Sequence, residues 1–219
     1  MRLKILFVLL VISPASSAWL ALPAFWQSGN TPGQAAYTAV GSYTFVVPVG
    51  ITNISVVAIG GGGSGIQFGG TVCGGGGGAL SYKNGITVTP GQHITVSVGA
   101  AGAPSLFGGF LNTGGGAPGS SVSSPGGAKD GTATGGGNGG AGSCGFGGSW
   151  PGGSAGLYTG TGAVGGGTGT GIKGPGSSPT YGAGGTSIYS GSPTPGVSGA
   201  VRIIWGPGRS FPSTNVTDM

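Results

Sequence analysis

Residues 54–63 read ISVVAIGGGG, and in this stretch an apolar segment runs directly into glycine. Residues 54–59 are mostly apolar and rich in β-branched side chains, which is typical of a strand buried on both faces. The four glycines that follow offer no side chain to a core. The stretch therefore predicts a buried strand followed by a glycine-rich loop, residues 60–78.

Further short runs of strand-forming residues lie on both sides of this stretch. The turn at residues 49–53 suits an antiparallel pair between residues 43–47 and 54–59. Asn84-Gly85 is a strong two-residue hairpin signal. No window outside the N-terminal segment has the 3.6-residue period of an amphipathic helix. The sequence predicts an all-β fold, a small β-sandwich with glycine-rich loops, with further strands expected at residues 79–83, 86–89, 93–98 and 199–205.

A long glycine tract occupies residues 99–196, and the whole chain has 58 glycines among 219 residues. Ordering glycine costs more conformational entropy than ordering any other residue. If the tract is folded, the interaction that we expect to offset this cost is packing as a polyglycine-II bundle, in which rods with three residues per turn approach closely and pair their backbone groups. The turns between rods are expected at Pro118-Gly119, Pro125-Gly126, Pro151-Gly152 and Pro175-Gly176.

The composition leaves few residues for chemistry. The chain has two carboxylates, Asp130 and Asp218, and one histidine, His93. A pair of catalytic carboxylates would need Asp218, the penultimate residue, and a Ser-His-Asp site would need His93, which follows a turn. The net charge of +5 comes from scattered cations without a basic stripe. We therefore expect no enzyme activity, no cofactor, no metal site and no nucleic-acid partner.

The N-terminus has the features of a secretory signal. Residues 1–18 combine an early positive charge, an apolar core and a small-residue cleavage site. The alternative is an apolar plug that docks into a larger assembly. We divide the chain into this signal-peptide-like segment, a linker at 19–36, a glycine-rich β domain at 37–205 and a C-terminal tail at 206–219.

Two kinds of side chain stand out within the glycine segments. Cys73 and Cys144 are the only cysteines, and they are either joined in a disulfide, as export would favour, or unpaired. Large aromatic side chains are the second kind. They either form an uncharged receptor-contact surface at loop tips or cap the glycine tract as a small core; these candidates are Phe107, Phe110, Phe146, Trp150, Tyr158, Tyr181 and Tyr189.

Over roughly residues 37–215, the chain resembles the glycine-rich domains of phage tail-fibre and adhesin proteins, which are virion structural proteins. The residues that carry the resemblance are 43–48 and 54–63, then 74–84 and 88–92, and the ending at 199–206 and 209–214. The resemblance implies a virion adhesin at a tail fibre or its tip, whose candidate receptor loops lie within 60–78 and 103–196. The signal-like N-terminus departs from that pattern, because phage structural proteins assemble in the cytoplasm.

The leading expectation is therefore a non-enzymatic adhesin in the virion tail that binds a bacterial cell-surface glycan or outer-membrane protein. Its other partners would be virion tail proteins, and we expect several copies or a homo-oligomer. The alternative is an exported, secreted or extracellular bacterial surface or matrix protein with the same domain. Ice binding is a third interpretation, which the irregular threonine spacing disfavours.

Overall fold

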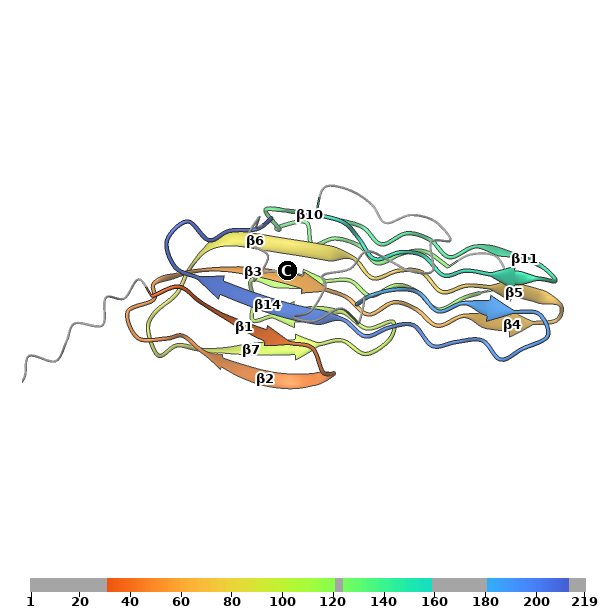
Figure 1. The fold of residues 1–219 in the computed structure, drawn as a ribbon, viewed down its shortest axis with the longest axis horizontal. Helices are drawn as coiled ribbons and strands as arrows, with labels where there is room; N and C mark the ends of the chain where they lie inside the picture. The colour runs from red at the N-terminus through yellow and green to blue at the C-terminus, as the bar shows by residue number, and fades with distance from the viewer. Residues whose placement is uncertain (1–30, 121–123, 159–180, 213–219) are drawn as a thin grey trace, which may run out of the picture.

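The computed structural model describes residues 31–120, 124–158 and 181–212, and every regular element in these ranges is a β-strand (Figure 1). This confirms the predicted all-β class. The strands form four antiparallel sheets. No helix that could cross a membrane occurs in these ranges.

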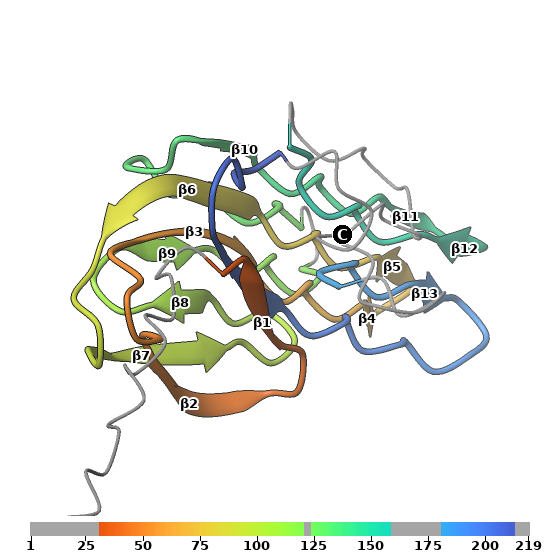
Figure 2. The ribbon, with the colours of Figure 1, turned by 60° about the vertical axis from the view of Figure 1, so that its left-hand side comes forward.

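The two larger sheets face each other at one end of the molecule and enclose the main core (Figure 2). One sheet has five strands in the order β1 (Gly33–Tyr37), β14 (Ala200–Trp205), β3 (Asn53–Ile59), β6 (Leu80–Thr87) and β10 (Gly135–Gly137). The other has four strands in the order β2 (Gly41–Val46), β7 (His93–Val98), β8 (Ser105–Phe107) and β9 (Leu111–Thr113). Alternating apolar residues of both sheets meet between them, as the period of two requires. Val56, Val96, Phe107 and Ile203 are among the fully buried members of this core.

Two predicted strand pairings are wrong. Residues 43–47 and 54–59 do not pair, because β2 joins β7 in one sheet while β3 lies between β14 and β6 in the other. The turn between them carries the chain across the sandwich.

The Asn84-Gly85 signal does not make a hairpin either, and residues 79–83 and 86–89 are not separate strands. Both residues lie inside the single strand β6, where the register against β3 shifts. Gly85 has a φ of +68° and stands at this bulge. Asn84 uses its side-chain amide to bond the backbone N–H and C=O of Phe211.

The ends of the β domain extend beyond the predicted bounds. Residues 33–36, which we assigned to a linker, form most of β1 and pair with β14. Residues 206–212, which we assigned to a tail, fold back along the sheet. Arg209 Nη1 donates a hydrogen bond to the Gly33 carbonyl at 2.6 Å, and the Phe211 side chain is buried.

A second, smaller core covers the outer face of the five-stranded sheet. The side chains of the sheet that point to this side include Val57, Ile59, Leu80, Ala200 and Ile204. Further chain segments cover them with Ala155, Tyr181 and Phe211. Tyr158 stacks on Phe211 with ring centroids 6.3 Å apart and lies 5.7 Å from the Tyr82 ring.

Arg202 lies on the same outer face and is buried. Its Nη1 atom has no hydrogen-bond partner among the described residues. Burial lowers the pKa of Arg202, and the nearby Tyr158 and Tyr181 hydroxyls act in the opposite direction.

Burial raises the pKa of Tyr158 to about 12, a shift that the Arg202 charge opposes and Tyr82 supports. In the unfolded chain the phenol ionises near pH 10, so its contribution to stability is complete below about pH 10 and is lost as pH rises through about 12. We expect the free energy of unfolding to fall over this range, and to fall less in Tyr158→Phe. Urea denaturation at about pH 9 and about pH 11 measures this, with the exposed Tyr189→Phe as control. An equal fall in both variants would contradict the assignment.

Glycine segments extend from the sandwich towards the other end of the molecule (Figure 1). The central one, residues 74–79, hydrogen-bonds through its backbone to six neighbouring segments. N–H groups three residues apart in this segment donate to the same neighbouring segment. Gly75 donates to the Gly185 carbonyl at 2.8 Å, and Gly78 donates to the Gly182 carbonyl at 2.7 Å. The other neighbours of this segment are residues 60–63, 114–117, 127, 140–143 and 153–156.

These segments have no space for side chains. A Cβ atom on Gly75, Gly76 or Gly77 would meet the backbone carbonyl of a neighbouring segment far inside the 3.0 Å that real Cβ contacts keep. The glycines are therefore a packing requirement, because only a chain without Cβ atoms approaches its neighbours this closely. Backbone hydrogen bonds in several directions, rather than apolar side chains, hold this half of the molecule together. Of the predicted breaks, Pro175-Gly176 lies outside the described residues.

Candidate functional site: an exposed apolar tip

The far end of the glycine segments consists of two small sheets. One has three strands in the order β11 (Cys144–Phe146), β5 (Thr71–Cys73) and β4 (Ile66–Phe68). The other pairs β12 (Ser149–Trp150) with β13 (Ser187–Ile188). Strands β4, β5 and β11 lie at the end of the molecule opposite the sandwich (Figure 1).

A disulfide fixes the three-stranded sheet. Cys73 and Cys144 are directly opposed in the register of β5 and β11, with Cα atoms 4.1 Å apart, and their sulfur atoms are bonded. The sequence left open whether these cysteines pair, and the structure pairs them. The bond joins chain segments 71 residues apart, at the side of the three-stranded sheet nearer the sandwich.

Two phenylalanines lie in one row of this sheet. Phe68 and Phe146 both oppose Thr71, on either side of it, so the three side chains share one face of the sheet. The cysteines are two residues along from this row and lie on the same face. The Phe68 side chain is 69% exposed and the Phe146 side chain is 83% exposed.

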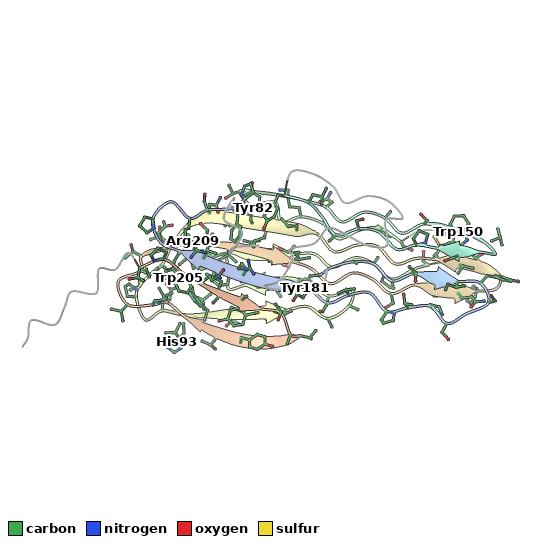
Figure 3. The ribbon with its side chains drawn as sticks, viewed as in Figure 1. Tyr82, His93, Trp150, Tyr181, Trp205 and Arg209 are labelled. Carbon is green, nitrogen blue, oxygen red and sulfur yellow. A yellow bond between two sulfur atoms is a disulfide. The ribbon has the colours of Figure 1, made fainter. Side chains whose placement is uncertain are left out.

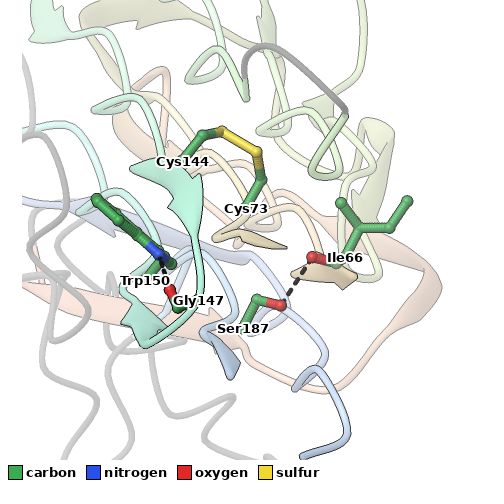
Figure 4. The surroundings of a disulfide bond; sticks show 6 residues. All are labelled: Ile66, Cys73, Cys144, Gly147, Trp150 and Ser187. Carbon is green, nitrogen blue, oxygen red and sulfur yellow. Dashed lines mark hydrogen bonds between the residues drawn. A yellow bond between two sulfur atoms is a disulfide. The ribbon is translucent and has the colours of Figure 1, made fainter. Parts of the chain in front are cut away.

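The opposite face of the three-stranded sheet is covered by β12 and β13. Figure 4 shows Trp150 beside β11, with its indole Nε1 donating a hydrogen bond to the Gly147 carbonyl at 2.6 Å. The indole occupies the space where a Cβ on Gly145 would lie. The Ser187 hydroxyl donates to the Ile66 carbonyl at 2.7 Å, which ties β13 to β4 (Figure 4).

The end of β13 and the turn after it add two more exposed apolar side chains. Ile188 is 42% exposed and Tyr189 is 49% exposed. The Tyr189 N–H donates to the Gly148 carbonyl at 2.8 Å, and its carbonyl accepts a hydrogen bond from the Gln67 side chain at 2.5 Å. These bonds hold the turn after β13 against the turn that contains Gly148 and against strand β4, which contains Gln67. We call Phe68, Phe146, Ile188 and Tyr189 the apolar tip.

The seven predicted contact residues divide between the tip and the two cores. Phe146 and Tyr189 are exposed at the tip, and Trp150 supports it as a half-buried side chain (Figure 3). Phe107 and Tyr181 are not contact residues, because each is buried in a core.

The remaining two candidates are half-buried supports of the cores. Phe110 packs on Phe107 at a centroid distance of 6.0 Å, and Tyr158 packs against the second core. Phe107, Phe110, Tyr158 and Tyr181 thus belong to the cores, and receptor contact stays a prediction for the other candidates.

Phe68 and Ile188 also belong to the tip, and neither was predicted from the sequence. A signal for Phe68 was present, since the triplet Phe-Gly-Gly occurs at 68–70, 107–109 and 146–148. In the first and third triplets both glycines have positive φ, as tight turns between strands require. Ile188 has no comparable signal.

The tip carries no charge. Residues 64–73, 143–151 and 185–194 contain no Asp, Glu, Lys, Arg or His. The charged residues of the described chain lie in the sandwich half. There the carboxylate of Asp130 accepts backbone hydrogen bonds from Asn112 at 2.6 Å and Thr132 at 2.7 Å. Burial would raise the pKa of Asp130, but these hydrogen bonds lower it below its ordinary value.

The described residues contain no group of three metal-ligating side chains. A pocket of about 150 Å³ lies at the sandwich end and is lined by backbone-rich turns, with Ile51, Trp205 and Arg209 among its side chains. The tip, in contrast, is a projecting surface that can make apolar contacts. A scan against protein-family models and a search of curated proteins found no match to this chain.

Proposed function

We propose that this protein is a non-enzymatic virion adhesin, at a tail fibre or its tip, which binds a bacterial surface receptor through the apolar tip. The observation that carries the proposal is the exposure of four large apolar side chains at one uncharged end of the molecule. Large exposed apolar side chains gathered at one end of a soluble protein favour an interaction site there. Rigid aromatic side chains give large contact areas at low entropic cost.

The glycine segments support this role as a spacer. We propose that they form a polyglycine-II bundle, since their hydrogen bonds repeat every three residues and reach six neighbours around residues 74–79. Such a bundle holds the tip away from the sandwich and fixes its three turns relative to one another. The disulfide adds to this rigidity.

An uncharged tip forms few charge-assisted hydrogen bonds, so the affinity of one site is modest. Several copies on one particle would raise the effective affinity through avidity. In this proposal the receptor is a glycan or an outer-membrane protein, and the sandwich end contacts other virion tail proteins.

Adsorption of the purified protein to a panel of bacterial strains tests the proposal. We expect the double variant Phe68→Ser/Phe146→Ser to bind cells at least ~30-fold more weakly, because removing central aromatic anchors costs about 2 kcal/mol or more. Both side chains are exposed, so the variant folds normally. The matched control is Val49→Ser, an exposed residue of the sandwich end, which should bind as the unchanged protein does. Failure of the unchanged protein to bind any strain, or equal binding by both variants, would contradict the proposal.

The second candidate is an exported bacterial surface or matrix protein. The Cys73–Cys144 disulfide favours it, because disulfides persist in oxidising compartments outside the cytoplasm. Fractionation of the producing cell separates the two functions. Recovery of processed protein in the medium or envelope supports export, and recovery in purified virions supports the adhesin.

A further inference from the structure

The sandwich has four outer strands, and three of them are short or have a bonded edge. β10 consists of three glycines. β9 also has three residues, and its Asn112 N–H is bonded to the Asp130 carboxylate. β1 has five residues, one fewer than β2, and the carbonyl of its first residue, Gly33, accepts a hydrogen bond from Arg209 in the segment that follows β14. Short edge strands and edges covered by a loop are means by which proteins protect sheet edges.

The fourth outer strand, β2, has none of these features. It has six residues, GSYTFV, without a charge or a proline, and its register against β7 has no irregularity. Among the described segments it pairs only with β7. A long, regular and uncharged edge strand is a template for another strand.

The direction of its free backbone groups follows from the bonds to β7. The Val47 N–H donates to Gln92, and the Val47 carbonyl accepts from Gly91, both at 2.9 Å. In an antiparallel ladder, residues alternate between bonding one neighbour and bonding the other. The N–H and C=O groups of Ser42 and Thr44, and those of Val46, therefore point away from β7.

Exposed valines flank this edge. Val46 is 49% exposed at the end of β2, and Val40 is 54% exposed just before its start. The outward-facing side chains between them, Ser42 and Thr44, are exposed and small.

We propose that β2 is a dimerisation edge that pairs antiparallel with β2 of a second copy of this chain, with Tyr43 on the two-fold axis. This register places Ser42 of one copy opposite Thr44 of the other, so that outward-pointing groups bond each other. It also places Val46 beside Val40 of the other copy. An axis through Thr44 would pair Ser42 with Val46 and leave Val40 uncovered.

The proposal rests on the strand and not on the proposed function. The four-stranded sheets of two copies would join into one continuous sheet with a closed two-fold interface. Since β2 runs along the long axis of the molecule (Figure 1), antiparallel pairing points the two apolar tips in opposite directions. A dimer could then bridge two surfaces.

Light scattering after size-exclusion chromatography of the full chain tests the dimer. We expect the unchanged protein to be a dimer and Thr44→Lys to dissociate at least ~10-fold more readily, because the two introduced lysines lie within about one Debye length of each other. The matched control is Thr95→Lys, which changes the same residue type on the paired position of β7. It should remain a dimer. Far-ultraviolet circular dichroism checks that both variants fold. A monomeric unchanged protein, or variants that behave alike, would overturn the proposal.

The register has its own test. Val40→Cys/Val46→Cys should form a covalent dimer under mild oxidation. Continuing the proposed pairing one residue beyond the start of β2 places Val40 opposite Val46 of the other copy, where Cα atoms about 5.5 Å apart are within disulfide range. Each single substitution should not. Absence of the covalent dimer, or its formation by the single variants, would overturn the Tyr43-centred pairing. Neither result depends on cell binding, so failure here is distinct from failure of the adhesin proposal.

Discussion

Replacing Gly77 with alanine should lower the free energy of unfolding by about 3 kcal/mol or more, the upper part of the range for inserting a group into a packed interior. Gly77 lies in the central glycine segment, donates to the Gly140 carbonyl at 2.9 Å and accepts from the Gly127 N–H at 2.8 Å. A Cβ there would meet the Ser154 carbonyl at a distance that no real contact shows. The obstacle is backbone on a bonded segment, so no side-chain rotation relieves it.

Thermal unfolding measures this effect. A loss of 3 kcal/mol lowers the midpoint by about 6–12 °C in a chain of this size. Gly109→Ala is the control, because Gly109 lies in a turn with negative φ and nothing within 4 Å of the added Cβ. It should change the midpoint little. Equal midpoints for Gly77→Ala and Gly109→Ala would mean that the glycine segments do not pack as closely as described.

Removing the disulfide should produce the other large loss of stability. In the chain-entropy description, a bond between cysteines with a sequence separation of 71 contributes about 4 kcal/mol. We expect Cys73→Ala/Cys144→Ala to lose about this amount in denaturant unfolding. The tip amides should exchange faster before the sandwich amides do, because the bond lies at the base of the tip.

As a control, the stability of the unchanged protein and of the double variant is measured with and without a thiol reductant. Reductant should lower the stability of the unchanged protein towards that of the double variant and leave the variant unchanged. A variant as stable as the oxidised protein would contradict the expected contribution. Reduction that acts equally on both would show that the reductant acts elsewhere.

Much of the sandwich could be predicted from the sequence. The alternation in residues 93–98 and the apolar run at 54–59 are local patterns, and both segments are strands with the expected buried faces. Strand pairing could not be predicted in the same way. The Asn84-Gly85 pair supplies a positive φ in either a hairpin or a bulge, and only the continuous partner strand β3 makes it a bulge.

For the candidate site, too, some properties could be predicted from the sequence and others could not. The absence of charge from the tip segments can be read from the sequence, as can the presence of aromatics among glycines. Exposure cannot. Phe68, Phe107 and Phe146 each precede two glycines, yet Phe107 is fully buried while the other two project from the tip.

The sequence by itself determined the all-β class, the glycine segments and a chemistry without acids or bases in the tip. These properties depend on local periodicity and on which side chains exist. The tertiary structure decided which turns meet at the tip, that Cys73 faces Cys144, and which strand leaves an open edge. These three features depend on contacts between segments that lie far apart in the chain. Glycine has no side chain, so a glycine segment carries no local pattern that specifies which segments pack beside it.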